Sequence, residues 1–322
     1  MDKKFTITSI LSIAALLIIF SVSLLVGSIP LNIPDLLTAG SVSNIVFFSI
    51  RLPRVFAALL SGLAFSVSGL LIQRATGNGL SSPNIIGVNS GAGASVLLFL
   101  SLAPDMFAIL PLAAFLGAII SVSIVFLISS LTKRVSSSIS LILSGVAVNA
   151  LFNAVISTIS SLDPETMASY SAFSIGGFSG IYSSMLRIPA LLIIISIALS
   201  FLLSDRMDVI SLGDEIASSM GYRPLGIRIL LIAIASLLAA SAVTFSGLLG
   251  FVGLVTPHAA SFLTSDNSRR TLILSSLIGP SLVMLSDLAG RTIISPSELP
   301  AGVFMAIIGV PFFIFLLLRR ND

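Results

Sequence analysis

The chain has 322 residues, of which 56% are hydrophobic and only 9% are charged. A soluble domain carries about 25% charged residues, so this composition excludes a soluble protein and predicts one that crosses a membrane several times. The absence of Cys excludes disulfides and thiolate metal sites, and a net charge of +3 is too small to indicate nucleic-acid binding.

Apolar stretches long enough to cross a bilayer recur along the chain. A helix rises about 1.5 Å per residue, so about 20 apolar residues cross the ~30 Å hydrocarbon core. The first stretch exceeds the ~7–15 apolar residues of a secretory signal, so we interpret it as an uncleaved helix. The sequence predicts ten transmembrane helices, at residues 5–26, 52–72, 86–103, 107–131, 136–160, 188–204, 229–248, 250–264, 271–289 and 301–318.

The distribution of Lys and Arg predicts which side of the membrane each loop occupies. With the N-terminus inside, twelve of the sixteen basic residues fall in cytoplasmic segments. This bias predicts that both termini are cytoplasmic, and a single long helix over 229–264 would break it. The other four basic residues fall on the outer side: Arg51, Arg54, Arg187 and Arg291.

Two of these outer arginines stand together at the head of an apolar run. Arg51 and Arg54 flank Pro53, which fits the first turn of a helix because its missing N–H breaks no hydrogen bond there. Spaced three residues apart, the two arginines share a helix face and are predicted to reach water. There they can pair with carboxylates of a partner, or they can serve as membrane anchors without a partner.

Residues 205–228 form the largest predicted cytoplasmic loop, and it contains a short amphipathic segment. Apolar residues recur there at four-residue intervals: Leu212, Ile216 and Met220. With Gly221 at its end, the pattern predicts a helix over 211–221 that is too short to span the membrane. Such a helix can dock on a partner or rest on lipid, and the adjacent acids Asp214 and Glu215 favour the partner.

Few residues could bind an ion or a cofactor. The P-loop pattern G-x-x-x-x-G-K-[ST] does not occur, so the chain is not expected to bind ATP phosphates by itself. The single His258 cannot form a multi-histidine metal site, and either packing or a proton relay would explain it. Asp287 lies within an apolar segment, four residues before Arg291. We expect this arginine to neutralise Asp287, the alternative being an ion-coupling carboxylate. Ser and Gly residues such as Gly62 and Ser66 suit helix packing or the lining of an aqueous path.

Seven stretches, in order along nearly the whole chain, resemble the permease subunits of ABC importers for ferric siderophores, haem and cobalamin. They are RLPRVFAALLSGLAFSVSGLLIQ, NIIGVNSGAGA, LILSGVAVNALF, SIGGFSG, FSGLLGFVGLVTPHAASFL, LSDLAGRTI and ELPAGVFMAIIGVPFFIFLL. One loop departs from the family pattern Asn-Pro-Leu-Ala-(x)-Pro. Here it reads NGLSSP, with Gly79 in place of the first proline, so no loop geometry is carried over.

The resemblance implies an all-α integral membrane protein of the type II ABC importer permease architecture, with residues 1–322 as a single permease domain. Its ten helices would pair with a second permease subunit, identical or related, in the bacterial cytoplasmic membrane. Two ATP-binding ABC subunits would hydrolyse ATP, and an extracytoplasmic substrate-binding protein would deliver an iron chelate. A ferric siderophore is the first expectation, before haem or cobalamin. The chain itself would be no enzyme, would hold no cofactor and would contact membrane lipid but no nucleic acid.

The resemblance also implies roles for individual residues. Those that would dock the binding protein are Arg51, Arg54 and Arg291. Those that would contact the ATPase are Gly213, Asp214, Glu215, Ala217, Met220 and Gly221. The cytoplasmic gate would include Ser138, Ile139 and Ser140.

Two other functions remain open on the residues alone. A secondary transporter would couple a small solute to H⁺ or Na⁺, and it would need an ion site for which only Asp287 or His258 could serve. A membrane scaffold without transport activity is the other alternative, although the Ser- and Gly-rich helices and the amphipathic loop segment argue against it.

Overall fold

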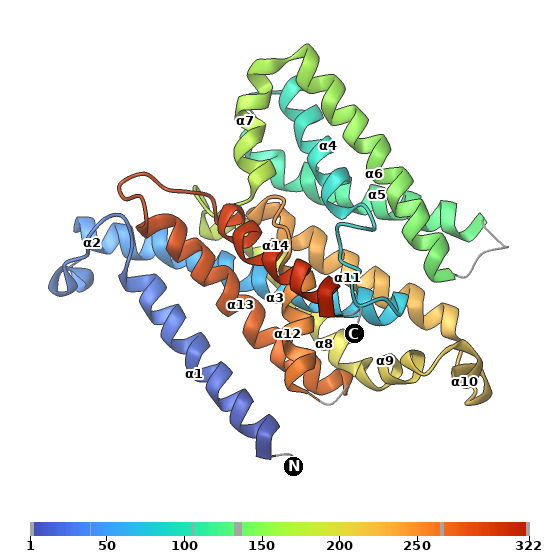
Figure 1. Cartoon of the computed structure of the whole chain (residues 1–322). Coiled ribbons are helices and arrows are strands. Elements are labelled where there is room, and N and C mark those ends of the chain that lie inside the picture. The colour runs from blue at the N-terminus through green and yellow to red at the C-terminus, as the bar shows by residue number, and fades with distance from the viewer. Residues whose placement is uncertain (1–2, 39, 105, 132–136, 265–266, 320–322) are drawn as a thin grey trace.

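The structure is a computed structural model that describes residues 3–38, 40–104, 106–131, 137–264 and 267–319 (Figure 1). Every regular element within these ranges is a helix. The long or apolar helices are α1 (Lys3–Leu25), α3 (Leu52–Thr76), α4 (Val88–Leu102), α5 (Leu110–Leu131), α6 (Ser137–Leu162), α8 (Ser183–Leu202), α11 (Pro224–Ser246), α12 (Val252–Leu263), α13 (Ser268–Thr292) and α14 (Ala301–Arg319).

These ten helices correspond one to one with the ten predicted spans. Seven are long and apolar enough to cross a membrane, and three shorter apolar helices, α4, α12 and α14, complete the set. Two helix starts shift by five residues: α8 begins at Ser183 instead of residue 188, and α11 begins at Pro224 instead of residue 229. Proline at the first helical position starts a helix readily, because its φ angle is already helical.

Of the shorter helical elements, the sequence predicted one, as a helix over 211–221. The shorter elements are η1 (Ile33–Leu37), α2 (Val42–Ile45), η2 (Val46–Arg51), η3 (Phe107–Ile109), α7 (Pro164–Ile175), α9 (Ser204–Ser211) and α10 (Asp214–Ser219). The element η2 is a π-helix that continues α3 backwards, so Val42–Thr76 is one helical stretch of 35 residues. Pro53 is near the start of α3, as predicted, but the helix does not begin there. The backbone N–H of Leu52 bonds to the carbonyl of Phe47, five residues back.

Helix α3 lies at the centre of the fold and is buried along most of its length. It packs mainly against α11, α13 and α12. Glycines allow this close approach: a Cβ atom on Gly62 would lie 2.5 Å from the carbonyl oxygen of Gly279, and one on Gly69 would lie 1.9 Å from that of Gly253. Small residues are the usual means by which membrane helices pack backbone to backbone.

The remaining helices surround this centre. Figure 1 shows α4, α5, α6 and α7 grouped together, and this group meets the rest of the fold chiefly through α11. Helix α1 packs on α13 and leaves most of its surface exposed, with Ser23 its one buried residue. The start of α3 therefore lies beside the end of α1, while its last turn lies near α9.

Candidate functional site

The structure brings the three predicted docking arginines into one cluster, where α1, α3 and α13 meet. We call Arg51, Arg54, Arg291, Asp287 and Glu298 the arginine cluster. Arg54 Nη2 lies 2.9 Å from Asp287 Oδ1, and Arg54 Nε donates to both oxygens of the same carboxylate, at 3.0 and 3.1 Å. Arg54 Nη1 donates to Glu298 Oε2 at 2.7 Å. One guanidinium therefore connects α3 to α13 and to the loop before α14.

The other two arginines hold the end of α1. Arg51 donates to the carbonyl oxygens of Leu24 at 3.1 Å and Leu25 at 2.5 Å, and also to that of Ile29. Arg291 Nη2 donates to the carbonyl of Ser23 at 3.0 Å. The last carbonyls of a helix have no partner within the helix and carry partial negative charge, so both contacts cap α1 favourably.

Asp287 is paired with Arg291, as the sequence predicted. Arg291 Nε lies 3.1 Å from Asp287 Oδ2, close enough for an ion pair although not aligned as a hydrogen bond. Asp287 is 2% exposed and is shared by two guanidinium groups. Both oxygens of this carboxylate therefore already face guanidinium groups, which argues against Asp287 as a site for a sodium ion.

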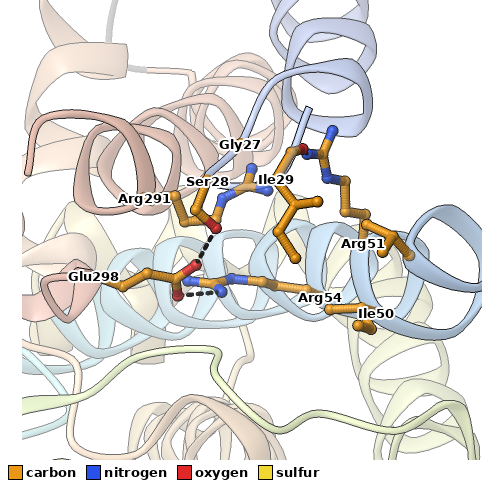
Figure 2. A pocket seen from close by; sticks show the side chains of 9 residues that line it. Gly27, Ser28, Ile29, Ile50, Arg51, Arg54, Arg291 and Glu298 are labelled. Atoms are coloured by element: carbon orange, nitrogen blue, oxygen red, sulfur yellow. Dashed lines mark hydrogen bonds and ion pairs between the residues drawn. The ribbon is translucent and has the colours of Figure 1, made fainter. Parts of the chain in front are cut away.

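The prediction that the arginines reach water is wrong for this structure. Arg51, Arg54 and Arg291 are 4%, 7% and 2% exposed. The three-residue spacing placed two of them on one helix face but could not reveal that α1 covers that face. A small pocket is lined by the three arginines and Glu298, as Figure 2 shows, together with Gly27, Ser28, Ile29 and Ile50; Val46 completes the lining.

Glu298 is the member of the cluster that the sequence interpretation missed. It lies in the loop between α13 and α14, its side chain is 28% exposed, and it also accepts a hydrogen bond from the Ser28 hydroxyl at 3.1 Å. Burial alone would raise the pKa of Glu298, but the hydrogen bond and charge of Arg54 outweigh it and hold this pKa below its usual value. An acid in a predicted outer loop close to outer arginines was the signal available in the sequence.

The helix predicted over 211–221 is interrupted: Ser211 ends α9, and α10 begins at Asp214. Gly213 joins them with a φ of +103°, a conformation that side chains disfavour, and Gly221, with a φ of +84°, follows the end of α10. Ala217 is fully buried, whereas Glu215 is exposed. The predicted apolar face is open to the surroundings, with exposures of 55%, 50% and 54% for Leu212, Ile216 and Met220.

Asp214 connects this segment to the transmembrane helices. It begins α10, and its Oδ1 accepts a hydrogen bond from Arg228 Nη2 of α11 at 2.8 Å. Arg228 is 7% exposed and also donates to the carbonyl of Ala75, in the last turn of α3. A second connection comes from α9, where Asp208 accepts from the backbone N–H of Ser268, the first residue of α13, at 2.9 Å.

The residues predicted as a gate lie at the start of α6. Ile139 is exposed, and the Ser140 hydroxyl lies 3.1 Å from the hydroxyl of Ser129 on α5. The side chain of Ser138 lies outside the described residues. These contacts place the start of α6 against the end of α5.

His258 packs at the interface between α12 and the loop after α3. Its Nδ1 lies 3.2 Å from the carbonyl of Leu254 in its own helix. A Cβ atom on Gly79 would lie 3.0 Å from His258 Nε2, so the glycine that departs from the family pattern leaves space for this ring. In the described part of the chain, no group of three or more His, Cys, Asp or Glu residues could hold a metal ion.

Comparisons with known proteins agree with the fold and with the resemblance. The Fe(3+)-citrate import system permease protein YfmE of Bacillus subtilis is 31% identical over 321 residues, covering 98% of this chain and 96% of that protein. The probable heme-iron transport system permease protein IsdF of Staphylococcus aureus is 34% identical over 304 residues, covering 93% of this chain and 92% of that protein.

A solved structure shares the whole fold. It is described as an inward-facing conformation of a metal-chelate type ABC transporter, and it superposes with a TM-score of 0.87. It is 28% identical in sequence, with 97% of this chain and 98% of that chain covered. Residues 15–319 match the FecCD transport family. This multi-pass membrane protein therefore belongs to the FecCD transport family.

Proposed function

We propose that this chain is the permease subunit of an ATP-driven ABC importer that carries an iron chelate across the bacterial cytoplasmic membrane. The observation that carries the proposal is the family match over residues 15–319, together with relatives of nearly equal length that are named as iron-citrate and heme-iron permeases. Both termini would face the cytosol, in agreement with the bias of basic residues.

The cargo is a ferric siderophore or a related ferric chelate, ahead of haem or cobalamin. In the described residues, no cluster of potential metal ligands is available to bind a bare iron ion. A conduit for an intact chelate needs no such cluster, because the chelator keeps the ligands of the metal. Selection of the chelate would then belong to the extracytoplasmic binding protein.

The arginine cluster is the proposed docking site of that binding protein. Three arginines face two carboxylates there, which leaves one uncompensated positive charge. Because Glu298 is partly exposed and Arg54 is not, a carboxylate of the binding protein would reach Arg54 by displacing Glu298. Docking of this kind is expected to depend on salt, because it joins opposite charges of the two proteins and salt screens their attraction before contact.

A variant of Glu298 tests the docking proposal without removing a buried arginine. Glu298→Gln removes the internal competitor and is expected to tighten binding of the binding protein and to steepen its salt dependence. Arg187→Gln, an exposed arginine at the start of α8, is the matched control. Binding that is unchanged by E298Q across a salt titration would reject Arg54 as a docking contact.

The exposed apolar face of α10 is the proposed contact with the ATP-hydrolysing partner subunits. Replacing Glu215 and Met220 together is expected to uncouple ATP hydrolysis from transport while the complex still assembles. The control is Leu162→Ala, at the end of α6, where the side chain is 80% exposed. Coupling at the wild-type level in the double variant would contradict the assignment of α10.

Transport by the reconstituted assembly tests the function as a whole. Liposomes would contain the chain, its ATPase subunits and its binding protein, with radio-iron-labelled ferric citrate or a ferric hydroxamate outside. We expect uptake that requires ATP and survives collapse of the proton gradient. Uptake by the chain without ATPase subunits, abolished by collapse of that gradient, would favour a secondary transporter instead.

A further inference from the structure

A hydrogen-bonded bridge joins α10 to the inner end of α3 through one buried arginine. Arg228 Nη2 donates to Asp214 Oδ1 at 2.8 Å, and Arg228 Nη1 donates to the carbonyl of Ala75. The three groups come from α10, α11 and α3. The bridge therefore connects the short exposed helix to the most deeply buried one.

The chemistry of each partner suits a lasting contact. Ala75 is in the last turn of α3, where carbonyls lack partners within the helix and attract positive charge. A guanidinium presents several donors in a rigid fork and can reach two acceptors at once, which an ammonium does less well. The Asp214 side chain is 55% exposed, so its ion pair alone would be weak in water. The buried Arg228, held at the same time by α3, gives the pair its fixed geometry.

Helix α3 and its neighbour α13 are joined again at their other ends. Arg54 of α3 binds Asp287 of α13, and the two helices approach closely at Gly62 and Gly279. The α9–α10 segment also holds α13, through Asp208 and the backbone N–H of Ser268. The same cytoplasmic segment is thus connected to both helices that carry the arginine cluster.

We propose that Arg228 is a positioning residue that makes α10 and the inner end of α3 move as one body. A displacement of α10 would then move α3 and with it the arginine cluster. Docking at the cluster would in turn displace α10. This inference rests on the proposed function, because it takes α10 as the element that the ATPase subunits move.

Distances between spin labels in the full assembly test the proposal directly. The chain has no Cys, so cysteines introduced for labelling at Ser218 on α10 and Arg74 on α3 would be the only ones in it. In the wild-type background we expect a narrow distance distribution that is the same without nucleotide and with ATP and vanadate. Arg228→Gln is expected to broaden it, and Arg228→Lys, which keeps the charge but loses the fork, to give an intermediate result.

The ratio of chelate transported to ATP hydrolysed provides the second measurement. The cargo would be ferric citrate or a ferric hydroxamate, whichever the wild-type assembly transports. Loss of a charge-assisted bond is expected to lower this ratio by about tenfold in R228Q. Arg187→Gln, an exposed arginine outside the bridge, should leave the ratio unchanged.

The outcomes distinguish a failure of this inference from a failure of the proposed function. If R228Q does not fold, Asp214→Asn breaks the bridge at its exposed end and should still broaden the distances. If an assembled R228Q complex keeps wild-type distances and coupling, the role of Arg228 is overturned and the proposed function is not. The same result in D214N decides the question when R228Q is unstable. Failure of the wild-type chain to assemble with any ATPase subunit would overturn the proposed function, and this inference with it.

Discussion

Replacing Asp287 with Asn is expected to be the most costly single change in the arginine cluster. The carboxylate accepts three hydrogen-bond contacts from Arg54 and pairs with Arg291. Its removal leaves two guanidinium groups, 7% and 2% exposed, with Glu298 as the one carboxylate of the cluster. Breaking a buried ion pair by removing one partner costs about 3–5 kcal/mol of unfolding free energy, because the remaining charge is buried without compensation.

Glu298→Gln supplies the matched comparison. Glu298 is partly exposed and accepts one hydrogen bond from Arg54, at 2.7 Å, so its loss is expected to cost about 1 kcal/mol. The double variant D287N/R291Q should recover part of the D287N loss, since it removes one of the stranded charges. Their coupling free energy is expected to be about 0.5–3 kcal/mol.

Unfolding of the full chain in mixed micelles, followed by circular dichroism as the denaturing detergent is increased, measures these free energies. The order D287N, then D287N/R291Q, then E298Q, from most to least destabilised, is the expected result. If D287N costs no more than E298Q, the carboxylate does not hold the two buried arginines. Strict additivity of D287N and R291Q would equally contradict the shared pairing.

Three further changes test other parts of the fold. The pKa of Glu298 is lowered in the folded chain, so its stabilising effect is present at pH 7 and is lost as pH falls below about 4. The difference in unfolding free energy between wild type and E298Q should therefore shrink over that range. A constant difference would contradict the pairing. Gly69→Val should force α3 and α12 apart at the Gly253 carbonyl and cost about 3 kcal/mol or more in the same unfolding assay, whereas Gly226→Ala, where no atom lies within 4 Å of the added Cβ, should be nearly neutral. Asn149→Ala removes bonds to two backbone carbonyls of the loop before α4, at 3.0 and 3.3 Å, and should raise the labelling rate of a cysteine placed in that loop; an unchanged rate would show that Asn149 does not hold the loop.

The helices were predictable because their signal is local. Ten apolar stretches of membrane-spanning length appear directly in the sequence, and each corresponds to a helix. The Asp287–Arg291 pair was predictable for the same reason, since residues four apart share a helix face. The four-residue spacing of Leu212, Ile216 and Met220 also predicted a short helix in this loop, although Gly213 interrupts the predicted helix and α10 covers only part of it.

The surroundings of the arginines were not predictable, because they depend on contacts between distant segments. Arg51 is held by carbonyls 22 to 27 residues earlier, and Arg54 by carboxylates 233 and 244 residues later. No periodicity within one helix encodes such contacts. The Arg228 bridge was not predictable for the same reason, since its acceptor on α3 lies 153 residues before it.

The burial of the arginine cluster changes how a docking event would act on this protein. A partner that met freely exposed arginines would gain a surface ion pair, which contributes little and need not alter the permease. A partner carboxylate that replaces Glu298 at Arg54 would instead disturb a network that holds α1, α3, α13 and the loop before α14 together. At their other ends, α13 binds Asp208 of α9, and α3 is joined to Asp214 of α10 through Arg228 of α11, so the same displacement would reach the opposite side of the fold. Buried arginines with internal partners are therefore better suited than exposed ones to make docking displace the helices as well as attach the partner.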